Sequence, residues 1–204
     1  MRDVVVLLSG GLDSTVVAAS ALADGCLHSC VSVRYGQPNM EAEMMASRKW
    51  CDNHEVKREV IVTPMPGSEM RTGIGTPGPR VLPGRNLLMI ALAVQYAAAV
   101  GARTVRLGAC KNDADDYPDC RMNFIDSIGA QTLEAYGVSV TAPLIHMPKA
   151  AIVREARRLG VDISATWSCY EPRPTGFTFS PCGSCNACRA RAEGMRLAVQ
   201  DHAQ

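Results

Sequence analysis

The sequence has 204 residues with a formal net charge of +1, and 47% of its residues are hydrophobic. This length suits a single compact domain with a sizeable core. Because 21 basic residues are balanced by 20 acidic ones and no long basic run occurs, the chain lacks the positive field that nucleic-acid binding usually needs. We therefore expect one domain over residues 1–204 and no nucleic-acid partner.

The N-terminal segment indicates a cytoplasmic protein. Its first three residues lead directly into the short apolar run Val4–Leu8, whereas a signal peptide carries a longer apolar stretch and a small-residue cleavage site. The longest apolar run, Leu87–Val100, contains Gln95 and is too short to cross a bilayer unaided. We expect neither export nor a membrane partner.

Short apolar runs alternate with helical patterns along the chain. Continuous apolar runs predict buried parallel strands, whereas apolar residues at helical spacing predict helices. The predicted strands are Val4–Leu8, Leu27–Val33, Glu59–Val62 and Thr104–Ala109. The predicted helices are Asp13–Asp24, Met40–Asn53, Asn86–Val100, Phe124–Tyr136 and Lys149–Leu159. The third helix is apolar nearly all round, so we expect it to be buried. This alternation predicts an α/β fold with a doubly wound, Rossmann-like parallel sheet, which binds ligands at the carboxyl ends of its strands.

The segment Thr63–Pro83 is rich in proline and glycine, and we interpret it as a mobile lid or a disordered loop. Its residues Gly73, Gly75 and Gly78 match a G-x-G-x-x-G pattern. A dinucleotide site would need this pattern to open a helix, whereas Pro77 stands inside it and no helix follows. We therefore exclude a dinucleotide site in this segment.

The segment Ser9–Thr15, with the sequence SGGLDST, stands between the first predicted strand and its helix. Glycines there let backbone amides close on an anion, and the N-terminus of the helix adds partial positive charge. An ordinary turn with Asp13 or Ser14 as the helix N-cap would explain one of these residues but not the whole set. The chain contains no Gly-Lys pair, so a Walker-type loop is excluded. The segment predicts a phosphate-binding loop of another kind.

Four of the nine cysteines gather near the C-terminus, at Cys169, Cys182, Cys185 and Cys188. An odd total fits a reducing compartment with a metal site better than a complete disulfide framework. Four thiolates suit a closed tetrahedral zinc site, with an iron-sulfur cluster as the second choice. A redox C-x-x-C pair would need a βαβ unit beside it, which the pattern lacks here. We expect residues 166–200 to form a segment folded by a structural zinc ion.

The SGGLDST loop resembles the SGGxDS signature of the PP-loop ATP pyrophosphatases, a superfamily with an adenine nucleotide alpha hydrolase-like fold. Members transfer AMP to a carboxylate, amide or nucleobase carbonyl and release pyrophosphate. This resemblance implies that ATP is the cofactor and that Mg²⁺ offsets the charge of the leaving pyrophosphate. The residues it assigns to ATP are Leu8, Ser9, Gly10, Gly11, Leu12, Asp13, Ser14, Thr15, Val16, Val17 and Ala18.

Further motifs, in order along nearly the whole chain, resemble the 7-cyano-7-deazaguanine synthase family of the queuosine pathway. They are Tyr35–Gln37, Pro83–Asn86, Tyr117–Cys120, Pro143–Leu144 leading to Lys149, Thr166–Tyr170 and the cysteine cluster. The resemblance implies a homodimeric ligase that forms C–N bonds. Its substrates would be 7-carboxy-7-deazaguanine, ammonium and ATP. The carboxylate would be adenylated, converted to an amide by ammonia and dehydrated to the nitrile with a second ATP.

The residues that the resemblance assigns to catalysis are Asp13, Ser14, Arg85, Asp119 and Lys149. Several of these residues and their neighbouring motifs also have a purely structural explanation. Arg85 could merely start a helix, although polar residues there can present donors to an anion. The motif Tyr117–Cys120 could be a β-turn, Lys149 a solvated charge, and Trp167 a core residue rather than a stacking platform.

Four features depart from the family's usual pattern. Gly84 stands where alanine is usual and Arg34 where an acidic residue is usual, and the other two are the acidic stretch Asp113–Asp116 and what looks like an insertion over Thr175–Ser180. Three other functions stay open. The chain could be a PP-loop ligase that joins a deazaguanine acid to another amine, or a PP-loop enzyme that modifies tRNA. It could also be a zinc-ribbon binding module without catalysis, although the intact Ser9–Thr15 loop disfavours that function.

Overall fold

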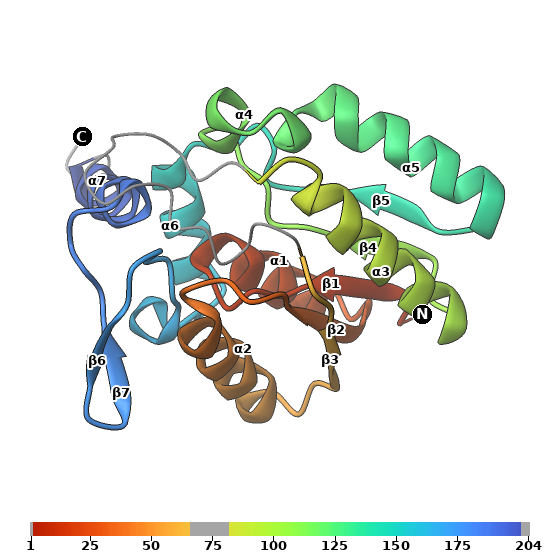
Figure 1. Ribbon diagram of the computed structural model, residues 1–204. Coiled ribbons are helices and arrows are strands. Elements are labelled where there is room, and N and C mark those ends of the chain that lie inside the picture. The colour runs from red at the N-terminus through yellow and green to blue at the C-terminus, as the bar shows by residue number, and fades with distance from the viewer. Residues whose placement is uncertain (1, 66–81, 201–204) are drawn as a thin grey trace.

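The structure, a computed structural model, describes residues 2–65 and 82–200. At its centre lies a five-stranded sheet in the order β3-β2-β1-β4-β5 (Figure 1). All neighbouring strands in this sheet run parallel. The strands are β1 Val4–Leu7, β2 Leu27–Arg34, β3 Arg58–Val62, β4 Thr104–Arg106 and β5 Ser139–Thr141. The strand order reverses at β1, where open parallel sheets bind ligands, so the predicted doubly wound fold is confirmed.

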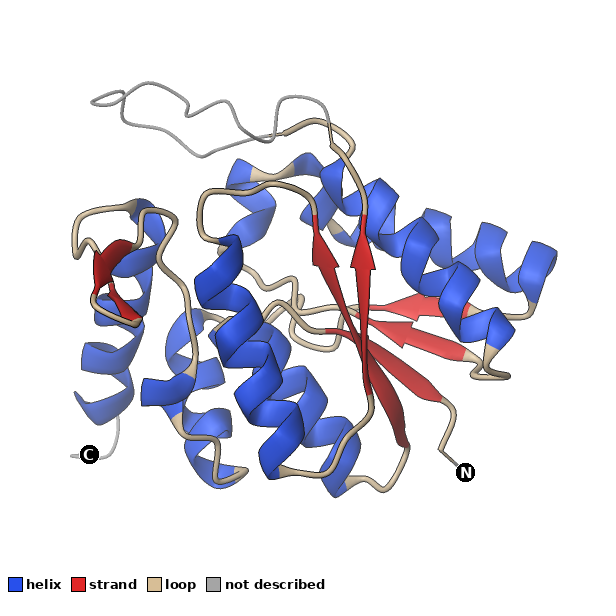
Figure 2. Cartoon of the chain, turned by 60° about the horizontal axis from the view of Figure 1, so that its bottom comes forward, coloured by secondary structure: helices blue, strands red, loops and turns tan. Residues whose placement is uncertain are grey.

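Helices cover both faces of the sheet (Figure 2). The α-helices are α1 Leu12–Ala23, α2 Met40–Asn53, α3 Arg85–Ala99, α4 Asp113–Asp116, α5 Met122–Tyr136, α6 Lys149–Arg158 and α7 Asn186–Gln200. Two short 3-10 helices, η1 Pro118–Cys120 and η2 Ile163–Ala165, and an antiparallel hairpin of β6 Arg173–Thr175 and β7 Thr178–Ser180 complete the fold. No helix in residues 2–65 or 82–200 is long and apolar enough to span a membrane.

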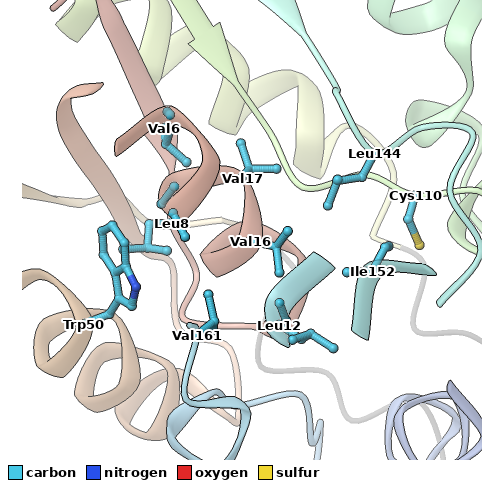
Figure 3. Close-up of a cluster of buried hydrophobic side chains, with 14 of the residues drawn as sticks. Val6, Leu8, Leu12, Val16, Val17, Trp50, Cys110, Leu144, Ile152 and Val161 are labelled. Atoms are coloured by element: carbon cyan, nitrogen blue, oxygen red, sulfur yellow. The ribbon is translucent and has the colours of Figure 1, made fainter. Parts of the chain in front are cut away.

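The core is split by the sheet into two layers. Along β1, Val4 and Val6 join the cluster beneath α1, α2 and α6, whereas Val5 joins the cluster beneath α3 and α5. Figure 3 shows the first cluster, in which Trp50 of α2 and Ile152 of α6 lie around the start of α1. Each fully buried aliphatic side chain contributes about 1.5–3 kcal/mol. The β1–α1 junction is therefore held in place by a well-packed apolar core.

The predicted secondary structure needs three corrections. The strand expected over Thr104–Ala109 pairs only as far as Arg106, because the following residues turn into the site described below. Strand β5 was not predicted, since three residues are too few to show an alternating pattern. Helix α3 is buried on one face only, and Leu87 is 45% exposed, because α3 is an outer-layer helix rather than a central one.

The C-terminal segment contains two elements that the sequence pattern did not predict. The insertion expected over Thr175–Ser180 forms the turn and second strand of the β6–β7 hairpin, which lies apart from the main sheet (Figure 1). Helix α7 packs against α6, and Gly194 permits close contact there, because a Cβ atom would lie 2.5 Å from Cγ of Lys149. The predicted glycine pattern at residues 73–78 falls outside the described residues.

Candidate functional site

A cavity of about 320 Å³ opens at the carboxyl ends of β1, β2 and β4. Its wall combines segments that are far apart in the sequence: the Ser9–Thr15 loop, the β2–α2 loop, the start of α3, the residues around α4, and α7. The polar and aromatic side chains of the lining include Asp13, Ser14, Tyr35, Glu43, Arg85, Asp113, Tyr117, Lys149, Trp167, Tyr170 and Arg191. The cavity stands at the strand-order reversal, where the fold predicts a ligand.

The phosphate loop has the geometry that an anion site requires. Helix α1 begins after Gly11, and no side chain in the described part of the chain caps it, so its first amide groups face the cavity end of the helix. The hydroxyl groups of Ser9 and Ser14 lie 3.1 Å apart. The hydroxyl groups of Ser14 and Thr15 both lie within donating distance of the Gly11 carbonyl, at 3.1 and 2.8 Å. The alternative of Asp13 or Ser14 as an N-cap is therefore wrong.

Gly10 cannot carry a side chain. Its φ is +82°, and a Cβ atom there would lie 2.7 Å from the backbone carbonyl oxygen of Glu43 and from the backbone nitrogen of Ser47. Gly25 also has a positive φ, of +69°, but a Cβ atom there meets nothing within 4 Å. The two glycines thus form a matched pair for separating backbone strain from steric contact.

We expect Gly10→Ala to destabilise the protein by roughly 2–4 kcal/mol, because left-handed strain and a backbone clash add together. Gly25→Ala should cost only the strain, roughly 1–2 kcal/mol. Chemical denaturation measures both values, and ATP binding by titration calorimetry should weaken for Gly10→Ala alone. Equal losses of stability in the two variants would contradict the close contact described for Gly10.

Asp13 and Lys149 form the charged centre of the cavity. The Lys149 Nζ atom lies 2.6 Å from Oδ2 of Asp13, and their side chains are only 15% and 21% exposed. Burial raises the pKa of Asp13, against the opposing charge of Lys149. Burial would lower the pKa of Lys149, but Asp13 raises it above its usual value, so the lysine stays cationic.

Asp13 also offers a ligand for a cation. Its Oδ1 atom is buried and has no hydrogen-bond partner among the described residues. Ligand atoms of Asp13, Cys110 and Asp113 all lie within 4.8 Å of one another. A buried carboxylate oxygen without a partner costs free energy unless a ligand compensates it. These residues could therefore hold a cation beside the phosphate loop.

Arg85 lies among three tyrosines at the cavity wall. Its guanidinium carbon is 5.4 Å from the ring centroid of Tyr117, and the hydroxyl groups of Tyr117 and Tyr170 are 3.4 Å apart. Burial raises the pKa of Tyr35 to about 12, so this hydroxyl stays protonated. Burial would lower the pKa of Arg85, but the tyrosines raise it. A permanent cation surrounded by hydroxyl groups suits a carboxylate ligand.

Asp119 was predicted to be catalytic, and the structure places it behind Arg85. Its carboxylate accepts hydrogen bonds from the backbone nitrogen of Asn86 at 3.2 Å and from Asn86 Nδ2 at 3.1 Å. Among the described residues, Asp119 is not part of the cavity lining. It therefore holds the N-terminus of α3, the helix that begins with Arg85, and its catalytic role stays a prediction.

Glu43 is a cavity residue that the sequence reasoning missed. It lies in the first turn of α2, and its two carboxylate oxygens accept hydrogen bonds from Gln37 at 2.9 Å and Asn39 at 2.8 Å. Burial raises its pKa to about 7. Its position shortly after the Tyr35–Gln37 motif could have indicated a site residue. Spacing alone, however, does not distinguish Glu43 from the exposed Glu41.

Arg191 of α7 is a second residue that the sequence reasoning missed. Its guanidinium donates to Thr166 Oγ1 at 2.8 Å, to Ser168 Oγ at 3.1 Å and to the Ile163 carbonyl. The neighbouring Trp167 donates its backbone N–H to the Gly10 carbonyl at 2.8 Å. Helix α7 is thus connected to the phosphate loop through one short segment.

We expect Arg191→Gln to loosen that segment and to raise the KM for ATP by roughly tenfold, because buried hydrogen bonds to a charged donor are worth about 1.5–3 kcal/mol each. Arg196→Gln is the matched control, since Arg196 lies on the same helix and pairs with Glu193 at the surface. Steady-state kinetics with varied ATP provide the measurement. A comparable rise in both variants would show that Arg191 has no specific role.

The four predicted metal ligands come together. The sulfur atoms of Cys169, Cys182, Cys185 and Cys188 all lie within 4.8 Å of one another. Backbone N–H groups of Glu171 and Cys182 donate to the Cys169 sulfur at 3.3 and 3.2 Å. Such donors stabilise thiolates, as metal-bound cysteines require, so the cluster can bind a metal ion through four sulfurs.

The residues predicted to bind ATP fall into two groups, one that lines the cavity and one that lies in the core beneath it. Leu8, Ser9, Gly11, Leu12, Asp13 and Ser14 line the cavity. Thr15 turns back to its own helix, and Val16, Val17 and Ala18 are buried in the core beneath it. Trp167 is half-buried and lines the cavity, and its indole lies against Phe179 of the hairpin at 6.3 Å between ring centroids.

The chain matches the family described as Queuosine biosynthesis protein QueC over residues 3–74 and 72–199. The chain belongs to the QueC family. A relative named 7-cyano-7-deazaguanine synthase from Rhizorhabdus wittichii is 36% identical over 95% of this chain and 90% of its own length. A relative of the same name from Erythrobacter litoralis is 36% identical over 93% and 86%.

Solved structures of low sequence identity agree with the QueC fold. The U34-tRNA thiolase NcsA from Methanococcus maripaludis, solved with its 4Fe-4S cluster, has a TM-score of 0.55 at 14% identity, covering 97% of this chain and 65% of NcsA. The NH3-dependent NAD synthetase from Campylobacter jejuni has a TM-score of 0.50 at 16% identity, covering 80% and 66%. These likenesses support the fold alone.

Proposed function

We propose that this QueC family protein converts 7-carboxy-7-deazaguanine to 7-cyano-7-deazaguanine with ATP and ammonia, as a C–N bond-forming ligase. One observation carries the proposal: a phosphate loop, a buried Asp13–Lys149 pair and a tyrosine-surrounded Arg85 line the same cavity. The first two suit a triphosphate, and the third suits the carboxylate that must meet it. The names of the curated relatives, 7-cyano-7-deazaguanine synthase, support the same reaction.

The chain's task is positioning and charge stabilisation. A carboxylate resists attack by ammonia because hydroxide is a poor leaving group. When the carboxylate attacks the α-phosphorus of ATP, pyrophosphate leaves, and ammonia can then displace AMP to give the amide. A second ATP activates the amide oxygen, and loss of AMP leaves the nitrile. The backbone N–H groups that follow Gly11, the hydroxyl group of Ser14 and the ammonium group of Lys149 would hold the leaving pyrophosphate. Arg85 would align the acid.

The two metals are proposals of the same kind. We propose Zn²⁺ at the four cysteines, because a closed set of sulfur ligands is typical of structural zinc. We propose Mg²⁺ beside Asp13, because its buried Oδ1 atom has no described partner and Asp113 lies near it. When bound, Mg²⁺ would offset the charge of pyrophosphate.

The proposed function is tested by incubating the purified protein with 7-carboxy-7-deazaguanine, ATP and ammonium chloride and following the products by mass spectrometry. We expect the amide and then the nitrile, with AMP and pyrophosphate rather than ADP. Absence of both deazaguanine products from a metal-loaded protein would refute the proposal. A conjugate formed only with another amine would favour the related PP-loop ligase, and activity only on tRNA would favour a tRNA-modifying enzyme.

We further propose that residues 1–204 act as a single synthase domain in which residues 166–200 carry the metal. The cytoplasmic location stays a prediction from the sequence, and the homodimer stays a prediction from the family resemblance. Sedimentation analysis of the intact protein tests the homodimer.

A further inference from the structure

Glu43 is a cavity carboxylate to which the proposed phosphate and acid contacts give no role. Its side chain lines the cavity together with Arg85 and the phosphate loop. The backbone of Glu43 also touches the loop, since its carbonyl oxygen would meet a Cβ atom at Gly10. The carboxylate therefore lies in the same cavity as the groups proposed to hold ATP and the acid.

Two carboxamides hydrogen-bond this carboxylate, and the positive charge of Arg85 lowers its pKa, against burial, from beyond salt-bridge distance. Gln37 and Asn39 each donate one hydrogen bond to a different oxygen of Glu43. Each carboxylate oxygen accepts about two hydrogen bonds, so capacity remains on the cavity side. Within residues 2–65 and 82–200, no lysine or arginine lies within 4.0 Å of Glu43. A buried carboxylate with spare acceptor capacity and no cation at salt-bridge distance favours a ligand that brings positive charge or N–H donors.

The other ligands of the cavity make a cation the better choice. ATP and the acid are both anions, and a carboxylate close to them would oppose their binding unless its own ligand were positive. Ammonium is the one proposed substrate that is a cation, and its N–H groups can donate to several acceptors at once. The Tyr35 hydroxyl, protonated because burial raises its pKa to about 12, lines the same part of the cavity.

We propose that the Glu43 carboxylate binds the ammonium ion that supplies the nitrogen and accepts the proton that this nitrogen must lose. The inference rests on the proposed function. Ammonium gives one proton to Glu43 and becomes ammonia, whose lone pair attacks the acyl carbon. The adduct then loses a further N–H proton as the bond to AMP breaks. Water takes each proton from Glu43 before the next transfer, so the carboxylate is regenerated. Burial raises its pKa to about 7, which suits repeated uptake and release near neutral pH.

The test compares Glu43→Gln with the wild type at fixed pH, with ammonium chloride varied and ATP and acid saturating. We expect the KM for ammonium to rise at least roughly tenfold, as for the loss of a charge-assisted hydrogen bond, with a fall in kcat. The KM for ATP and for the acid should change little. Acid-dependent exchange of labelled pyrophosphate into ATP, which needs no ammonium, should persist. Hydroxylamine, which is largely uncharged at neutral pH, should remain a good nucleophile and yield the hydroxamate.

The matched control is Glu41→Gln, because Glu41 lies in the same turn of α2 but is 58% exposed and pairs with Arg34. It should leave all constants unchanged. If Glu43→Gln unfolds, Glu43→Asp keeps the charge, and its KM for ammonium should rise while pyrophosphate exchange persists.

Two results would overturn the inference: an unchanged KM for ammonium, or a rise confined to ATP or the acid. The second would assign Glu43 to an amino group on one of their rings. Failure of the wild type to show either exchange or amide formation would instead refute the proposed function.

Discussion

Replacing Lys149 with methionine should lower acid-dependent pyrophosphate exchange by roughly a thousandfold, the usual scale for removing one group that stabilises developing charge. Two effects combine in this variant. The triphosphate loses a buried cation that stays charged in the folded protein. Asp13 loses the ammonium group 2.6 Å away, so its ionised form becomes costly in the buried site.

The control for this prediction is Lys111→Met. Lys111 is exposed on the segment that follows β4, and its backbone N–H bonds to the Met147 carbonyl close to Lys149 in the sequence. Its removal changes the net charge by the same amount without touching the cavity. Exchange kinetics and thermal unfolding should be measured on both variants. A Lys149→Met protein with more than about a tenth of wild-type exchange would exclude a central role in charge stabilisation.

Loss of the metal should have the second large effect. Structural zinc sites supply about 10–16 kcal/mol of binding free energy that is also folding free energy. We expect Cys185→Ser to purify without metal, to lose the order of α7 and to bind ATP at least roughly a hundredfold more weakly. The effect should reach the ATP site because Cys169 adjoins the segment in which Trp167 bonds to Gly10.

Three measurements separate this result from general unfolding. Metal content follows from elemental analysis, ATP affinity from calorimetry, and local order from hydrogen exchange. Exchange should quicken in residues 186–200 and in the phosphate loop, while β1 and β2 stay protected. Cys26→Ser is the control, because Cys26 lies outside the cluster and its sulfur donates a hydrogen bond to the nearby Ala21 carbonyl. Unchanged ATP affinity in metal-free Cys185→Ser would exclude the coupling.

Most of the sheet could be predicted because the signal is local. Strand β1 is a continuous apolar run, and β2 and β3 are short, largely apolar segments next to helices with clear spacing. The SGGLDST loop combines its whole signature in consecutive residues. Helix α7 escaped prediction for a physical reason. Its buried residues are the small Gly194 and Ala198, whereas Met195, Leu197 and Val199 are exposed. A helix that packs through small residues shows little apolar periodicity.

The candidate site was predicted in parts, and its arrangement depended on long-range contacts. Asp13, Arg85 and Lys149 were recognisable by motif, and the structure places them around one cavity. The roles of Asp119 and Glu43 depend on which neighbour each one faces. Asp119 lies against Asn86, and Glu43 faces the cavity, and neither fact is encoded in a short pattern.

The hydrogen bond from Trp167 to the Gly10 carbonyl also has a consequence for folding during synthesis. The phosphate loop is synthesised well before the segment around Trp167 that completes it. Contacts between such distant residues form late, since closing a long loop costs entropy before any contact compensates it. We expect the nascent chain to build its sheet early and to acquire its nucleotide site only after residues 166–200 have emerged and taken up metal. A truncated chain would therefore be folded in part but unable to consume ATP.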